Sequence, residues 1–521
     1  MQRDGSVPMG VSGGGRLLPL AGWVLAGVTA VLLLLSLDWG IVHDAPLMLY
    51  IGREVAHGAR SVVDIFDMNM PLVHWLYAVF YALFGVNDLA WRLLDLAVIG
   101  GIAALGYRLI LPAVGQQLAA LAAVCIVAQH VAGEEQVVGQ RDVWMVLPLF
   151  GAALLIVAAR EQPRGRWKLV DAGVLLGMAA MLKPIGLVYA PILLLAALLG
   201  GKPVAGWRPA AMIAVRLGCG FAIPCFVVGL VLYLQGLLPA FIEFWAEFVP
   251  VYGRARDDTN AIANLLGPAV GGLAIAGVAA MSTGSHVKRW PSLRVAVVLA
   301  LVIAGFFSFL LQGKGWIYHA LPLQYSAILL TAVGLASIRP VGHLGHLVAR
   351  IMVLVPVPFI VLLFAEVLAI KIALQAISLG NGPQTPPPYV TALMRDLDQI
   401  ASPDDKVQAL DMTDGVIAAV LRSNRRQPTR FIYDFQFFSG QPSAYRAALR
   451  QEFLDRLGTA GAHVLVVTNQ NWPGKRGFER VDDAKLWPEL NERLKTRYRL
   501  VLERSDSQLP DRRYRIYKAA P

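Results

Sequence analysis

Residues 170–200 read VDAGVLLGMAAMLKPIGLVYAPILLLAALLG, and the number of times this stretch crosses a membrane decides the topology of the whole chain. The stretch is apolar over almost its full length, and Lys183 and Pro184 interrupt it near the middle. Proline breaks the hydrogen-bond ladder of a helix, so the stretch is either one long kinked helix or a hairpin of two short helices. The charges in the rest of the chain decide between these two alternatives.

Composition places most of the chain in lipid. Of the 521 residues, 56% are hydrophobic and 16% are charged, and the mean hydropathy is +0.57, whereas soluble domains carry about 25% charged residues. Nine further apolar runs are long enough to cross roughly 30 Å of hydrocarbon; they lie at 17–37, 89–111, 117–133, 143–159, 210–235, 261–281, 295–311, 318–338 and 350–372. With a hairpin at 170–200, we expect a polytopic α-helical membrane protein of about 11 spans.

The distribution of charge supports the hairpin. The net charge is +11, but the basic residues of the first 370 positions lie in short loops rather than in one patch, so we expect no nucleic-acid partner. With the hairpin, loops on one side hold fourteen Lys and Arg, at Arg3, Arg16, Arg108, Arg160–Lys168, Lys202, Arg208, Lys288–Arg294, Arg339 and Arg350. The opposite loops hold most of the acidic residues, so the positive-inside rule places the basic loops in the cytoplasm. Each arm of the hairpin has about 15 residues, or about 23 Å of helix, so we expect this pair to be short or deeply seated.

An odd number of spans with a cytoplasmic N-terminus puts the C-terminal tail outside. Residues 1–16 are expected to be a cytoplasmic N-terminus before a first helix that is retained, because no small-residue cleavage site follows. We expect a membrane domain at 17–372, a linker at 373–389 and a small α/β domain at 390–521. In that domain the sequence predicts strands and helices; the strands lie at 406–410 and 462–468, and the helices at 414–422, 444–457 and 486–496.

The segment Pro71–Gly85, PLVHWLYAVFYALFG, is apolar but too short to span a bilayer easily. It begins with proline and contains His74, so we interpret it as a juxtamembrane or re-entrant helix in the first outer loop. Counting it as a span would invert every later loop and place the basic loops outside.

The first outer loop has an ordered series of polar, glycine and proline positions: Asp44, Tyr50, Gly58, Pro71–Leu72, Phe84–Gly85 and Arg92. In this order it resembles the GT-C class of membrane glycosyltransferases, especially the branch with bacterial protein O-mannosyltransferases and the lipid A aminoarabinose transferase. The resemblance extends over residues 20–340 and implies a GT-C-like bundle with juxtamembrane helices and a polyprenyl-phosphate-linked sugar donor. The class usually has an Asp–Glu pair here, but in this sequence Asp44 lies between His43 and Ala45, so the second carboxylate is missing.

Two carboxylates are the candidate catalytic residues. Inverting transfer to a hydroxyl group needs a base, and partial burial can adjust the pKa of Asp44 for this task. The alternative is that Asp44 only caps an interfacial helix. Asp142 begins a later helix at a position where the resembling class has an acidic residue. Asp44 and Asp142, with Glu134 or Glu135, could hold a divalent cation such as Mg, Mn or Ca.

The candidate ligands of a lipid phosphate are cationic or polar residues at the outer membrane edge. Lys183 interrupts the 170–200 stretch, although it could instead be a lysine that reaches the headgroups. The string from Gln312 to Pro322, QGKGWIYHALP, offers Lys314, Tyr318 and His319, although its aromatic residues could simply anchor the interface. Arg92 is a secondary candidate. Residues 236–260 are expected to form a membrane-surface helix, or a helix that guides a prenyl chain.

These residues predict a glycosyltransferase that moves a sugar from polyprenyl phosphate or diphosphate to a glycan, lipid or protein acceptor. Asp44 would act as the base, the anomeric carbon would be inverted, and Lys183 with Lys314 would stabilise the leaving phosphate. The expected location is the bacterial inner membrane, with the active site and the C-terminal domain on the periplasmic side. The alternatives are a lipid or glycan transporter or flippase with a periplasmic accessory domain, and a non-catalytic scaffold.

Overall fold

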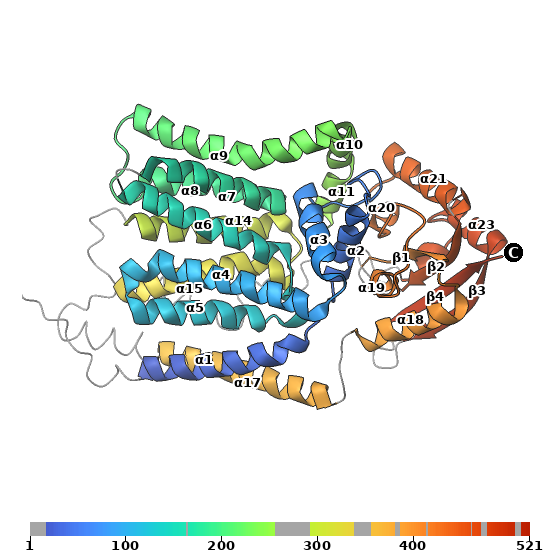
Figure 1. Ribbon diagram of the computed structural model, residues 1–521, viewed down its shortest axis with the longest axis horizontal. Coiled ribbons are helices and arrows are strands. Elements are labelled where there is room, and N and C mark those ends of the chain that lie inside the picture. The colour runs from blue at the N-terminus through green and yellow to red at the C-terminus, as the bar shows by residue number, and fades with distance from the viewer. Residues whose placement is uncertain are drawn as a thin grey trace, which may run out of the picture.

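The computed structural model describes residues 17–162, 165–255, 292–337, 356–380, 386–412, 415–459, 461–469, 477–505 and 512–520. The long helices lie side by side in one bundle, and a smaller domain with a β-sheet covers one end of it (Figure 1). The prediction of a helical membrane domain followed by a small α/β domain is confirmed.

The bundle is built from ten helices in the described residues: α1 (Leu17–Leu35), α4 (Asp88–Val114), α5 (Gln116–Val131), α6 (Arg141–Glu161), α7 (Lys168–Leu182), α8 (Tyr189–Leu199), α9 (Trp207–Leu234), α14 (Leu293–Gln312), α15 (Ile317–Ser337) and α17 (Pro356–Gly380). Seven of the helices in the described part of the chain are long and apolar enough to cross a membrane, while α5, α7 and α8 are shorter. The predicted span at 261–281 lies outside the described residues, so the total of about 11 stays a prediction.

The decisive stretch, 170–200, forms two helices and not one. Helix α7 ends at Leu182, a 3₁₀ turn runs over Pro184–Val188, and α8 begins at Tyr189. Gly186 is necessary in this turn, because an added Cβ would lie 2.8 Å from the backbone of Ala179 on α7. The turn therefore folds tightly against the end of α7, and the two arms are as short as the sequence predicts.

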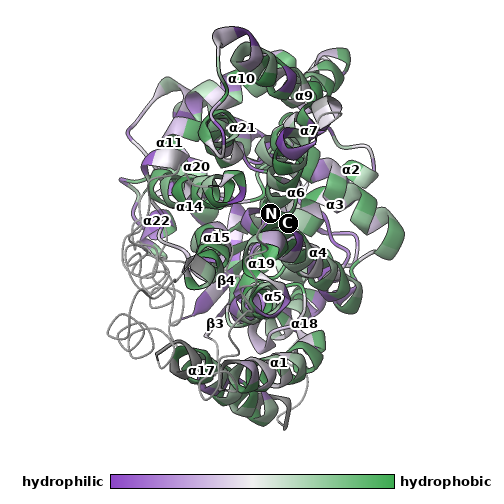
Figure 2. Cartoon of the chain, turned by 90° about the vertical axis from the view of Figure 1, so that its left-hand side faces the viewer, coloured by the Kyte–Doolittle hydropathy of each residue, from purple (hydrophilic) through white to green (hydrophobic). Residues whose placement is uncertain are grey.

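Helix α7 packs closely against α9 through small residues, as is common between membrane helices. A Cβ on Gly220 of α9 would lie 2.0 Å from the carbonyl oxygen of Val170. The outward faces of α1, α9 and α17 expose large apolar side chains such as Trp23, Phe226 and Leu374. Figure 2, seen from the end away from the C-terminal domain, shows largely hydrophobic helices throughout the bundle. These faces are suited to contact with lipid tails.

Four short helices lie at the end of the bundle that faces the C-terminal domain. They are α2 (Ala45–Ala56), α3 (Pro71–Phe84), α10 (Leu238–Glu247) and α11 (Val249–Arg254). Helices α2 and α3 run across the direction of the bundle helices (Figure 1). Each begins with proline in its first turn, where the missing N–H has no helical partner to lose. The two short helices predicted between the first and second bundle helices are present, and their placement outside the cytoplasm stays a prediction.

The C-terminal domain consists of a four-stranded sheet and surrounding helices. The strands are β1 (Lys406–Leu410), β2 (Ala462–Thr468), β3 (Tyr498–Ser505) and β4 (Arg513–Ala519), in the order β1-β2-β4-β3. The β1–β2 pair is parallel and the other two pairs are antiparallel. The helices are α18 (Pro388–Ile400), α19 (Val416–Arg422), α20 (Phe435–Phe438), α21 (Ala444–Thr459), α22 (Glu479–Asp482) and α23 (Pro488–Arg497).

The predicted strands coincide with β1 and β2 because their residues are buried on both faces and therefore form continuous apolar runs. The sequence did not predict β3 and β4, which carry charged residues such as Arg499 and Arg515. Helix α17 continues to Gly380, so residues 373–380 of the predicted linker are helical. The other domain boundaries, and the side of the membrane on which each part lies, stay predictions.

We expect Gly220→Val to destabilise the protein by about 3 kcal/mol or more, because the new side chain would push α9 away from α7. Gly218→Val is the matched control, since a Cβ at Gly218 on the same helix meets no atom within 4 Å. The apparent Tm of the purified proteins in detergent measures the difference. An equal Tm for both variants would contradict this packing.

Candidate functional site

Asp44 lies at the end of the bundle that faces the C-terminal domain, directly before α2. One carboxylate oxygen, Oδ1, lies 3.2 Å from Nδ1 of His43, and the other, Oδ2, accepts a hydrogen bond of 3.5 Å from the hydroxyl of Tyr318. The side chain makes no capping hydrogen bond to α2. The alternative that Asp44 serves only as a helix cap is therefore not supported by its contacts.

The charge state of Asp44 follows from its neighbours. Burial raises the pKa of this carboxyl group, but the imidazole of His43, the guanidinium of Arg141 and the amide of Gln140 lower it further than burial raises it. The resulting pKa lies below the ordinary range of aspartate. Asp44 is therefore ionised at neutral pH and can accept a hydrogen bond or a proton from an approaching hydroxyl group.

Asp142 and Lys183 form an ion pair that connects the start of α6 with the turn after α7. Asp142 is 1% exposed, and its Oδ1 also accepts a hydrogen bond of 3.3 Å from the side chain of Gln312. Burial lowers the pKa of Lys183, and Asp142 opposes this effect. Lys183 thus contacts a buried carboxylate and does not simply extend toward the lipid headgroups.

Lys314 lies between two glycines that both have positive φ angles, 58° at Gly313 and 64° at Gly315. Its side chain is 2% exposed, and Nζ donates hydrogen bonds to the carbonyl oxygens of Tyr252, at 2.8 Å, and Ala255. Nζ also lies 4.3 Å from the centre of the Tyr252 ring. Lys314 therefore fastens the 312–316 loop to α11, and its contribution to phosphate binding stays a prediction.

Tyr318 and His319 begin α15 beside these charges. Tyr318 is buried and donates to Asp44. His319 is 4% exposed, its ring lies 5.2 Å from that of Trp316, and its Nδ1 has no hydrogen-bond partner among the described residues. A buried ring nitrogen without a partner is unfavourable unless a ligand or water satisfies it, so His319 is suited to contact a bound group.

Arg92 is not next to Asp44. Its guanidinium donates to Asp95 at 2.5 Å and to the hydroxyl of Ser36 at 2.7 Å, and it lies over the ring of Trp39. Asp95 also accepts hydrogen bonds from His130 and from the backbone of Gly139, each at 2.9 Å. This buried network holds Gly139, two residues before α6, in place. Arg92 therefore supports the position of α6 through Asp95 and does not itself face Asp44.

The predicted metal ligands are not brought together. Glu134 pairs with Lys371 on α17, and the acidic residues close to Glu135 are Asp38, Glu134 and Asp88 rather than Asp44 or Asp142. Within the described residues, no three His, Cys, Asp or Glu side chains lie close enough to hold a metal ion. Because Lys183 already contacts Asp142, the set Asp44, Asp142 and Glu135 does not fit a metal site.

Arg141 also belongs to this site, although it was not among the residues predicted from the sequence. Arg141 is the first residue of α6 and is close enough to Asp44 and Asp67 to lower the pKa of both. Its side chain makes no hydrogen bond or ion pair with another described residue, although the carboxylates of Asp44, Asp67 and Asp142 are close enough to attract its charge. An arginine directly before an acidic residue at a predicted helix start was the available signal. Lys183 and Lys314 both donate hydrogen bonds to protein oxygens, so among the described cations of this site the guanidinium of Arg141 is the one that has its donors left for a ligand.

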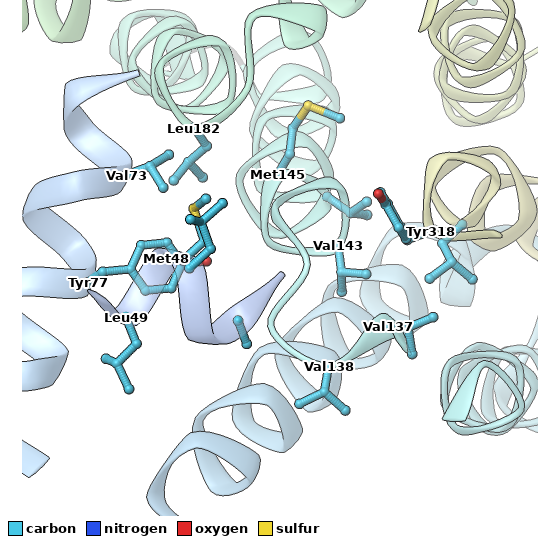
Figure 3. Close-up of a cluster of buried hydrophobic side chains, with 14 of the residues drawn as sticks. Met48, Leu49, Val73, Tyr77, Val137, Val138, Val143, Met145, Leu182 and Tyr318 are labelled. Atoms are coloured by element: carbon cyan, nitrogen blue, oxygen red, sulfur yellow. The ribbon is translucent and has the colours of Figure 1, made fainter. Parts of the chain in front are cut away.

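Apolar packing holds these charged residues in position. Figure 3 shows Met48 and Leu49 of α2, Tyr77 of α3 and Leu182 of α7 in the buried layer around the start of α6. Tyr77 stacks against Trp144 with ring centres 5.4 Å apart. Close packing at this layer fixes the crosswise helices against the bundle, so the positions of the charges are determined by the fold.

We expect Glu135→Gln to stabilise the protein at pH 8 and to have little effect near pH 4. Burial, with the acidic neighbours Asp38, Glu134 and Asp88, raises the pKa of Glu135 from 4.5 to about 7. The folded state therefore holds this proton more tightly, and stability decreases as the pH rises through this interval. Removing the charge should increase the free energy of unfolding by up to about 2 kcal/mol at pH 8, after allowance for solvent screening.

The apparent Tm at pH 4 and pH 8, with Glu489→Gln on the exposed face of α23 as control, measures this effect. An equal change in Tm at the two pH values would contradict the raised pKa of Glu135.

Comparison with known proteins agrees with the resemblance found in the sequence. Residues 69–231, less than half of the chain, match the family described as dolichyl-phosphate-mannose-protein mannosyltransferase. No curated protein matches the sequence. The fold is similar to that of ArnT from Cupriavidus metallidurans bound to undecaprenyl phosphate, with a TM-score of 0.60 and 16% identity over 95% of this chain and 98% of that chain.

The apo structure of the same ArnT gives a TM-score of 0.60 and 15% identity, covering 96% of this chain and 98% of that chain. The Archaeoglobus fulgidus oligosaccharyltransferase in complex with zinc and sulfate is more distant, with a TM-score of 0.45 and 14% identity over 85% of this chain and 68% of that chain. The family match and the ArnT-like fold confirm the predicted resemblance and indicate a membrane glycosyltransferase of the GT-C type.

Proposed function

We propose that this protein transfers a sugar from polyprenyl phosphate or polyprenyl diphosphate to an acceptor outside the cytoplasm, with inversion at the anomeric carbon. The observation that carries the proposal is the position of Asp44, an ionised carboxylate beside Arg141, at the end of the bundle where the Asp142–Lys183 pair also lies. A base for the acceptor hydroxyl and cations for the leaving phosphate are thus present in one place. The similar ArnT structure holds undecaprenyl phosphate, which supports a donor of this class.

The orientation proposed for the site is extracytoplasmic. The opposite end of the bundle carries Arg160, which donates to the carbonyl of Lys202, and Arg294, which donates to the carbonyl of Leu109. Basic loops collected at that end favour its placement in the cytoplasm. Asp44 and the C-terminal domain would then face the periplasm of a bacterial inner membrane, where a lipid carrier presents its phosphate at the interface.

Asp44 is proposed to orient the acceptor hydroxyl group and to accept its proton. The hydroxyl oxygen attacks the anomeric carbon from the face opposite to the phosphate, the bond from this carbon to the phosphate oxygen breaks, and the configuration inverts. A carboxylate with a lowered pKa is a weak base, so it accepts the proton late, when the attacking oxygen has become acidic. Tyr318 keeps the carboxylate directed toward the acceptor.

The leaving phosphate is proposed to bind Arg141 first and Lys183 second. A guanidinium can donate two parallel hydrogen bonds to phosphate, and α6 adds the positive end of its dipole at this residue. Lys183 can share its ammonium group between Asp142 and the phosphate, since the ammonium has three donors. His319, whose Nδ1 lacks a described partner, is the third candidate contact, whereas Lys314 shapes the loop.

We expect Asp44→Asn to lower kcat by roughly 100- to 10,000-fold while the protein still folds and binds its donor, because only the proton acceptor is lost. Transfer of a labelled sugar from polyprenyl phosphate in proteoliposomes measures the rate. Asp171→Asn is the matched control, because Asp171 is exposed near the opposite end of α7. A carrier or scaffold would keep its function in both variants, so unchanged activity of Asp44→Asn would refute the proposed transferase mechanism.

We expect Arg141→Gln to raise the KM for the lipid donor at least about tenfold, because a charged hydrogen bond contributes about 1.5–3 kcal/mol. Arg160→Gln, at the other end of α6, is the control and should leave the KM unchanged. Steady-state kinetics at varied donor concentration measures the KM of each variant. If both variants had the KM of the wild type, Arg141 would have no part in donor binding.

A further inference from the structure

The C-terminal domain contacts the first outer loop immediately before Asp44. Arg422, the last residue of α19, donates two hydrogen bonds to the carboxylate of Asp88, at 2.6 Å and 3.0 Å. The same carboxylate accepts a hydrogen bond of 2.7 Å from the backbone N–H of Ile41. Ile41 lies three residues before Asp44, so a side chain of the C-terminal domain supports the approach of the loop to Asp44 from one side.

A second set of contacts lies directly after Asp44, on α2. The backbone N–H of Gln427 donates to the hydroxyl of Tyr50 at 3.0 Å, and the guanidinium of Arg53 donates to the carbonyl oxygen of Arg425 at 2.6 Å. Both α2 side chains are buried. Since α2 begins at Ala45, the chain is held on both sides of Asp44 by residues that follow α19.

A third set of contacts reaches the other half of the candidate site, which is the 312–316 loop with Lys314, whereas the first half is the segment around Asp44. The backbone N–H of Phe66 donates to the carbonyl of Arg430 at 2.8 Å, and the ring of Phe66 contacts Phe248 with centres 5.0 Å apart. Phe435 contacts the rings of Phe248, at 5.8 Å, and Tyr252, at 5.4 Å. Tyr252 in turn accepts a hydrogen bond from Lys314. The C-terminal domain thus also supports the loop that carries Lys314.

We propose that residues 422–435 of the C-terminal domain, here called the positioning segment, hold the two halves of the candidate site in place, with Arg422 as a positioning residue for Asp44. His43 has a positive φ of 57°, which is uncommon for a residue other than glycine, so the backbone before Asp44 needs external support. A bidentate, half-buried pair between Arg422 and Asp88 supplies this support better than a fully exposed ion pair would. The inference rests on the proposed function only where an activity is measured.

The test compares Arg422→Gln with Arg515→Gln in the full-length protein. Arg515 forms equivalent ion pairs with Asp482 and Glu503, but inside the C-terminal domain and away from the first outer loop. Amide hydrogen exchange of peptides that contain Ile41 reports on the loop directly. We expect Arg422→Gln to accelerate exchange of this N–H by about tenfold or more and Arg515→Gln to leave it unchanged.

The kinetic readout is a decrease in kcat of about tenfold or more in Arg422→Gln with an unchanged KM for the donor, since Asp44 is displaced while the phosphate ligands are not. Arg422→Lys, which retains a cation, should recover part of the rate. Unchanged exchange at Ile41 would overturn the inference. If the wild type transferred no sugar, the proposed function would fall, and the exchange experiment would still decide whether the positioning segment holds the loop.

Discussion

The ion pair between Asp142 and Lys183 is the interaction on which the rest of the structure depends. Asp142 lies in the first turn of α6, at the end of the bundle near the C-terminal domain, so its contact with Lys183 places the break in the 170–200 stretch at that same end. Helix α7 therefore runs from the opposite end of the bundle to this turn, and α8 runs from the turn back to the opposite end. The direction of every later helix follows from this turn. The same contact brings Lys183 close to Asp44, and thereby connects the topology of the chain with its chemistry.

The membrane explains why the reactive groups gather there. Inside hydrocarbon, backbone polar groups must be satisfied within helices, so turns and irregular segments are confined to the ends of the bundle. The crosswise helices α2 and α3 lie at one such end (Figure 1). The start of α6 meets the 312–316 loop there, where the side chain of Gln312 donates to Asp142. Residues 39–44, directly before α2, form no helix or strand. Contacts with the bundle on one side and with the C-terminal domain on the other fix the conformation of this segment.

Hydropathy and charge were sufficient to predict the bundle, the hairpin at Lys183 and the crosswise helix at 71–85, because each depends on transfer of side chains between water and lipid. The fate of individual charges could not be predicted. Whether Arg92 faces Asp44 or Asp95 depends on the rotation of α4, and the contacts of Lys314 depend on the path of α11. Arg141 was missed because its position among the carboxylates of Asp44, Asp67 and Asp142 is a property of packing, which no local pattern reveals.

The placement of the Asp44 end of the bundle outside the cytoplasm is the proposal on which the mechanism depends. Its most direct test is labelling of single cysteines with a membrane-impermeant maleimide in intact cells, in a variant whose three native cysteines are replaced by serine. A cysteine at the exposed position Gln235, at the Asp44 end of α9, should react, and one at Lys202, at the opposite end, should react only after lysis. Labelling of position 202 but not of position 235 in intact cells would contradict the account.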